Sequence, residues 1–133
     1  MAGIATLAMK LNVTGIGDDV EVTQSQALTV PVEILKGYVV VSTAGTTAIQ
    51  LFTDITKIAL DKIYGVYIKA EVGTIYVMLN TAGTTTFTSA TADLVINTSE
   101  PCYLPINPLS NLGLTIDAAA VTDAFSFIIL GKV

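Results

Sequence analysis

The chain has 133 residues, which is enough for one domain with a substantial buried core. Only 13% of its residues are charged, its net charge is −5 and it has no arginine, the preferred side chain for contacts to phosphates and base edges, so we expect no nucleic-acid partner. It also has no histidine, which excludes Ser-His-Asp and Cys-His catalysis and the usual zinc sites.

The chain is unusually apolar. Hydrophobic residues make up 52% of it, and its mean hydropathy is +0.70. A helix that crosses a bilayer needs about 18 consecutive apolar residues, and the sequence contains no such run. We therefore expect no membrane partner, and we expect the excess apolar surface to be buried against other subunits.

Strand-forming residues dominate the chain from its start. Threonine, valine, isoleucine and tyrosine are abundant, and glycine, proline, asparagine and aspartate interrupt them about every eight to twelve residues. An N-terminal arm or first strand is expected over residues 4–13, before the glycines of TGIGDD. Further strands are expected over residues 20–23, 27–35, 38–42, 48–52, 56–60, 64–70, 74–80, 86–89, 94–97, 102–106, 112–117 and 125–130.

Local signals refine this pattern. Pro31 predicts an edge or a bend, because proline cannot donate a hydrogen bond to a neighbouring strand. Residues 64–70 and 74–80 give the strongest hairpin prediction, with the turn at residues 71–73 and with Tyr64 and Tyr76 paired across it. Residues 118–125 are interpreted as a loop, although three consecutive alanines favour a helix.

The pentapeptide TAGTT occurs twice, at residues 43–47 and 81–85, each time after an apolar run. Gly45 and Gly83 can supply a positive φ, and the threonine hydroxyls can bond to nearby backbone groups. We interpret the repeat as a turn used twice. A duplication is the alternative, but the flanking residues match only in type.

Few residues are candidates for chemistry. Asp18, Asp19 and Glu21 could hold Ca²⁺ in a glycine-rich loop, but they lack the spacing of a known calcium loop, so a solvated acidic turn is the preferred interpretation. Cys102 is expected to pack as a small hydrophobic residue. The remaining carboxylates show no spacing that favours a catalytic pair; they are Glu33, Asp54, Asp61, Glu71, Asp93, Glu100, Asp117 and Asp123.

The tyrosines have two interpretations. They can cover a core as strand residues, which we prefer, or they can form an interface. They are Tyr38, Tyr64, Tyr67, Tyr76 and Tyr103. We therefore predict no catalytic, cofactor-binding or metal-binding residue and no cofactor.

The second half of the chain resembles a known family. DKIYGVYIKAEVGTIYVMLN is followed by ADLVINTSEPCYLPINP, LGLTID and FSFIILGK. Over residues 61–133, this order is similar to that of capsid decoration, or cement, proteins of tailed bacteriophages, which have a jelly-roll-like β fold. Residues 1–60 match that family only in composition.

The resemblance implies a non-enzymatic virion protein that is made in the host cytoplasm and binds the outer surface of the phage head. It implies the major capsid protein as partner, a homotrimer as oligomer, and stabilisation of the shell through subunit contacts. We therefore expect an all-β, jelly-roll-like antiparallel sandwich or barrel, with residues 1–13 as an extended N-terminal arm or first strand and residues 14–133 as a single sandwich domain.

Two other hypotheses stay open. The chain could be another virion component, such as a tail, head-fibre or receptor-binding part, with a ligand site at strand-end loops such as TAGTT. It could also be a small enzyme or carbohydrate-binding module, but the absence of tryptophan and histidine argues against this class.

Overall fold

The computed structural model describes residues 3–15, 17, 20–28, 31, 33–41, 49–50, 58–79, 89–106 and 114–132. These residues form an all-β protein with a β-hairpin arm and a two-sheet sandwich, apart from one 3-10 turn, η2 (Leu60–Lys62). The all-β antiparallel sandwich is therefore confirmed. The two TAGTT segments lie outside the described residues.

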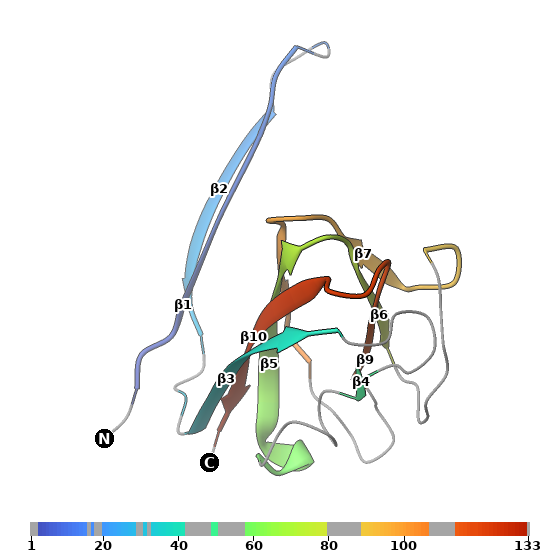
Figure 1. The fold of residues 1–133 in the computed structure, drawn as a ribbon. Coiled ribbons are helices and arrows are strands. Elements are labelled where there is room, and N and C mark those ends of the chain that lie inside the picture. The colour runs from blue at the N-terminus through green and yellow to red at the C-terminus, as the bar shows by residue number, and fades with distance from the viewer. Residues whose placement is uncertain are drawn as a thin grey trace.

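The arm consists of β1 (Thr6–Val13) and β2 (Val20–Ala27). The two strands pair antiparallel along their whole length, from Thr6 opposite Ala27 to Val13 opposite Val20. Gly15 and Gly17 have positive φ in the connection between them, where glycine is favoured. Figure 1 shows the hairpin projecting away from the sandwich.

The arm is longer than we predicted. We expected it to end at residue 13, but β2 pairs with β1 and with no other strand of the described chain. The predicted strand over residues 27–35 is divided between β2 and β3, with the buried Pro31 between them. Proline has no N–H group and cannot donate a hydrogen bond to a neighbouring strand.

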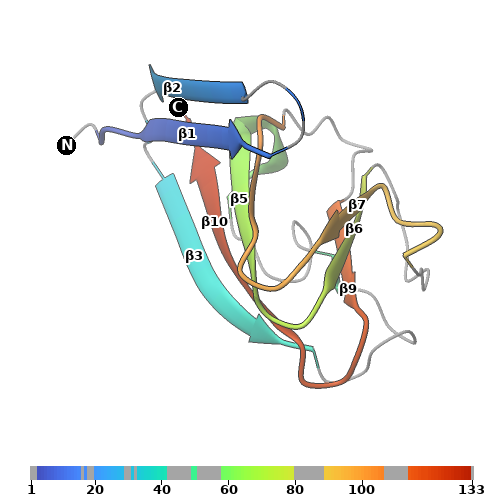
Figure 2. The same ribbon diagram turned by 90° about the horizontal axis from the view of Figure 1, so that it is seen from above.

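Two four-stranded sheets form the sandwich. The first has the order β3-β10-β5-β8, and the second has the order β4-β9-β6-β7. Figure 2 shows the two sheets facing each other. The strand bounds are β3 (Glu33–Val40), β4 (Ile49–Gln50), β5 (Ile63–Val72), β6 (Ile75–Leu79), β7 (Leu94–Ile96), β8 (Pro101–Leu104), β9 (Leu114–Ala118) and β10 (Ala124–Gly131).

The strands of the sandwich pair symmetrically about the connection between β6 and β7. β6 pairs with β7, β5 with β8, β4 with β9 and β3 with β10, all antiparallel. These pairs alternate between the two sheets. The chain from β3 to β10 is thus arranged as one long hairpin, folded between β6 and β7 and rolled up so that its successive pairs lie in opposite sheets.

The predicted hairpin of residues 64–70 and 74–80 is wrong, although both strands exist. β5 pairs with β10 and β8, whereas β6 pairs with β9 and β7 in the other sheet. Each strand buries alternate residues, and a corner between them lets both buried faces meet one core from opposite sides. Gly73, with φ 71°, makes that corner, and a Cβ atom there would collide with the Asp123 carboxylate.

The core lies between the sheets. Its largest fully buried side chains include Phe125, Ile68, Ile75 and Ile116. Phe127 also points into the core, where its ring covers Gly37 of β3 so closely that a Cβ atom on Gly37 would lie 2.7 Å from the ring. The alternation of buried residues therefore leaves the other side of the sheet β3-β10-β5-β8 as an outer face.

Candidate interaction surface

The hairpin has one apolar face and one polar face. Opposed residues of an antiparallel pair project to the same side, and successive residues alternate. The polar face carries Lys10 and Glu21, whose Nζ and Oε1 atoms are 3.7 Å apart. The apolar face consists of Leu7, Met9, Leu11, Val13, Val20 and Val22, followed by Gln24 and Gln26.

Most of this apolar face is exposed. The exposed fraction is 57% for Met9, 58% for Leu11 and 45% for Val22. Only Leu7, at the base of the hairpin, is partly buried. Isolated apolar side chains on a surface are ordinary, but a contiguous apolar patch marks an interaction site.

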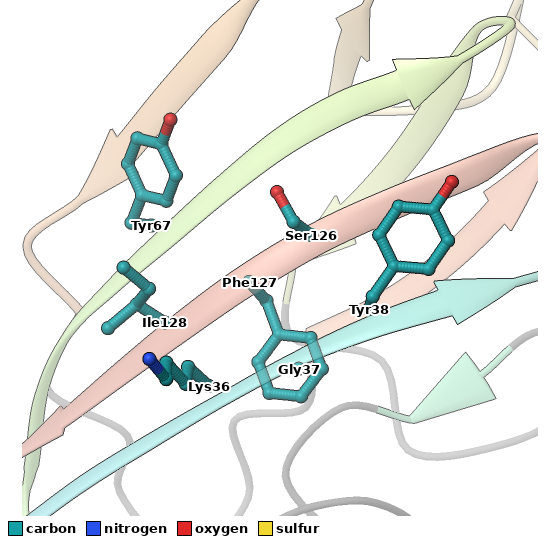
Figure 3. Close-up of a pocket in the computed structure, with 7 residues that line it drawn as sticks. All are labelled: Lys36, Gly37, Tyr38, Tyr67, Ser126, Phe127 and Ile128. Atoms are coloured by element: carbon teal, nitrogen blue, oxygen red, sulfur yellow. The ribbon is translucent and has the colours of Figure 1, made fainter.

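The outer face of the sheet β3-β10-β5-β8 carries a groove of about 430 Å³. Tyr38 on β3 and Tyr67 on β5 rise on either side of Ser126 on β10, and Lys36 and Ile128 complete the rim (Figure 3). Tyr38 is 58% exposed. The register explains this arrangement, because Tyr38 lies opposite Ser126 and Tyr67 lies opposite Ile128.

A polar network lies beside the groove. Ser126 Oγ donates a 2.7 Å hydrogen bond to Glu71 Oε1, and Lys69 Nζ is 3.3 Å from Glu71 Oε2. The hydrogen bond from Ser126, with the hydrogen bond and charge of Lys69, lowers the pKa of Glu71 below its usual value. The carboxylate therefore stays ionised at neutral pH and is held by groups on its own sheet.

A second groove lies at the base of the hairpin and has a volume of about 330 Å³. Ile4, Leu7 and Leu28 line one side of it. The outer face of the sandwich lines the other side with Tyr67, Tyr103, Ile128 and Leu130. Burial raises the pKa of Tyr103, and burial together with Tyr103 raises the pKa of Tyr64, so both phenols are protonated at neutral pH.

All five tyrosines lie on strands of the sandwich. None of the five is fully buried, and Tyr38 is exposed. The predicted contact of Tyr64 with Tyr76 is wrong, because Tyr76 lies opposite Val95 and Asp117 in the other sheet, whereas Tyr64 interacts with Tyr103.

The acidic residues that were considered for catalysis or metal binding, where the structure describes them, lie apart from one another or in turns. Asp18 and Asp19 lie outside the described residues. Asp117 and Asp123 are buried at the ends of the β9–β10 turn, where they accept hydrogen bonds from the backbone N–H groups of Ala118 and Ala120. Among the described residues, no group of three histidine, cysteine or acidic side chains could hold a metal ion.

Cys102 packs against the core from β8, as predicted. Burial raises the pKa of its thiol, which disfavours the reactive thiolate. The part of the chain that the structure describes contains no helix with the length and apolar character needed to cross a membrane.

Sequence reasoning missed the hairpin face and the groove. One signal for the hairpin was available: two segments of eight residues, TLAMKLNV and VEVTQSQA, flank a glycine-containing turn. No protein-family model, curated protein or solved structure matches the chain.

Proposed function

We propose that this chain is a non-enzymatic structural protein of a bacteriophage virion, a decoration protein that binds the outer surface of the head and stabilises the shell. The observation that carries the proposal is the projecting hairpin with its exposed apolar face. A surface of this kind is suited to burial against protein subunits. The proposed partners are the major capsid protein and further copies of this chain, in a trimer.

We also propose that the sandwich is a jelly roll. The mirror pairing of β3 with β10, β4 with β9, β5 with β8 and β6 with β7 supports this assignment, because jelly rolls are eight-stranded double sheets built from two Greek keys. Fold alone does not establish function, so the virion role depends on the hairpin and on the resemblance of residues 61–133.

The absence of enzymatic activity is part of the proposal. Several of the described carboxylates accept hydrogen bonds from the backbone. Asp117 and Asp123 accept them within the β9–β10 turn, and Asp93 Oδ2 accepts a 2.7 Å hydrogen bond from the backbone N–H group of Leu79. The groove on the outer face has two phenol rings at its rim, and tyrosine is a residue type that is enriched in protein–protein interfaces.

The test is to locate the chain in particles of a tailed phage whose genome encodes it. Purified heads and purified tails are probed separately with an antibody to the chain. Heads that lack the chain are then mixed with the purified protein and sedimented. The proposal predicts that the chain is found on heads, co-sediments with them and raises their disruption temperature.

Two variants make the binding test specific. Leu11→Glu puts a charge on the apolar face of the hairpin and should abolish co-sedimentation, whereas Thr23→Glu, on the polar face beside Lys10, should leave it unchanged. Absence of the chain from the particles would contradict a virion role. Its presence on tails alone would favour the second candidate, a tail, head-fibre or receptor-binding part that uses the groove between Tyr38 and Tyr67.

A further inference from the structure

The apolar face of the hairpin begins beside the sandwich of the same molecule. At the base, Leu7 lines a groove together with Tyr67, Tyr103 and Ile128 of the sandwich. Leu7 belongs to the same face as Met9, Leu11 and Val22. The face that meets the sandwich at its base therefore continues outward as an exposed apolar surface, while Figure 1 shows the hairpin leaving the sandwich.

The surface under the hairpin base also continues. The open groove with Tyr38 and Lys36 shares Tyr67 and Ile128 with the groove at the hairpin base. The covered and the uncovered parts of the outer face therefore have the same chemistry, tyrosine rings beside isoleucine. The groove at the hairpin base extends to Tyr103 and Leu130, whereas the open groove extends to Tyr38 and Lys36.

We propose that the outer part of the hairpin lies on the sheet β3-β10-β5-β8 of a second copy of this chain, in the groove between Tyr38 and Tyr67. Each copy then donates its hairpin to one neighbour and accepts the hairpin of another. Such head-to-tail contacts close into a ring when the rotation between copies allows it. The contact would supply the association between copies that the proposed function includes, but it does not depend on binding to a phage head.

Dimensions and charge favour a second copy as the occupant. The exposed part of the hairpin face covers five residues of β1, from Met9 to Val13, about 17 Å at 3.4 Å per residue, which fits within the eight-residue accepting strands β3 and β10. The hairpin face has no charged side chain, and the acceptor surface holds Glu71 in contacts with Lys69 and Ser126. Lys36 is at the rim, where its ammonium group can remain in water while its stem contacts the hairpin.

The contact is small, which makes the association depend on concentration. A two-stranded face about 17 Å long and 10 Å wide buries on the order of 350 Å² in total, counting both partners. Stable interfaces bury about 1,200 Å² or more. We therefore expect a mixture of single chains and oligomers that shifts toward oligomers as the concentration rises.

The test is the mass in solution of the full chain, measured by light scattering from about 5 to about 500 µM, a range that covers weak interfaces. The donor variant is Leu11→Glu and the acceptor variant is Tyr38→Glu. Thr23→Glu, on the polar face of the hairpin, and Val95→Glu, on the exposed side of the other sheet, are the matched controls. All four positions are exposed, and circular dichroism checks that each variant is folded.

We expect the mass of the wild type and of both controls to rise above the 13.9 kDa of one chain, and each test variant to stay at one chain. A 1:1 mixture of the donor and acceptor variants should form two-chain complexes, because each supplies the surface that the other lacks. A wild type that stays at one chain throughout overturns the inference, as does a mixture that does not associate. A single-chain wild type that still binds phage heads through its hairpin would assign the apolar face to the capsid and leave the virion role standing.

Discussion

Ser126, Lys69 and Glu71 form a small network whose effect on titration is directly testable. A carboxylate with a lowered pKa in the folded state stabilises the fold at pH values above its unfolded pKa, which is about 4.5 for glutamate. That stabilisation is lost as the pH falls through the lower pKa of the folded state. Because Glu71 is partly exposed, solvent screens the contribution.

Ser126→Ala removes the principal cause of the lowered pKa of Glu71. We expect the pKa of Glu71 to rise toward its usual value and the loss of stability on acidification to begin at a higher pH. Carbon-detected NMR titration of the Glu71 side chain measures this change. Ser25→Ala, on the polar face of the hairpin, is the matched control. Superimposable titration curves for wild type and Ser126→Ala would refute the assignment.

At the scale of elements, the period-2 patterns were sufficient to predict most strands of the sandwich but not their partners. Residues 64–70, 94–97 and 125–130 were predicted within a few residues of β5, β7 and β10. Pairing failed at the corner after β5, because a glycine that closes a hairpin and a glycine that turns the chain between sheets look alike in sequence. The apolar face of the hairpin was missed because alternation does not reveal whether a partner covers it.

The hairpin is expected to be removable as a unit, since none of its described residues belongs to the buried core cluster or packs against it. A deletion that ended at Lys10 would leave three of the eight residues of β1 and would break the pairing of the hairpin, because Lys10 lies opposite Thr23 within it. Removing residues 1–28 should instead leave a cooperatively folding sandwich that loses at most about 2 kcal/mol, from the partly buried contacts at the hairpin base.

Urea unfolding measures that loss, and Phe125→Ala provides the comparison. This residue is fully buried, so its truncation should cost about 3–5 kcal/mol. The shortened chain should also lose self-association and binding to heads. A shortened chain that does not fold would show that the hairpin is part of the sandwich and not a separate arm.

At the scale of the whole molecule, the high apolar content is explained in two parts. One part fills the core between the two sheets, and the other lies on the hairpin and on the outer face of the sheet β3-β10-β5-β8. Composition predicted this second, exposed part as a surface to be buried against subunits, but only the strand register locates it.

Amide hydrogen exchange over β1 and β2 tests the central claim most directly, because a two-stranded hairpin alone is marginally stable in water. It is measured on the full chain at low concentration, at high concentration and on phage heads. We expect the hairpin amides to exchange fast at low concentration and at least tenfold more slowly at high concentration or on phage heads. The amides of β5 and β10 should exchange slowly in all three states. Hairpin amides that exchange at the same rate in all three states would contradict the claim that this face is an interface.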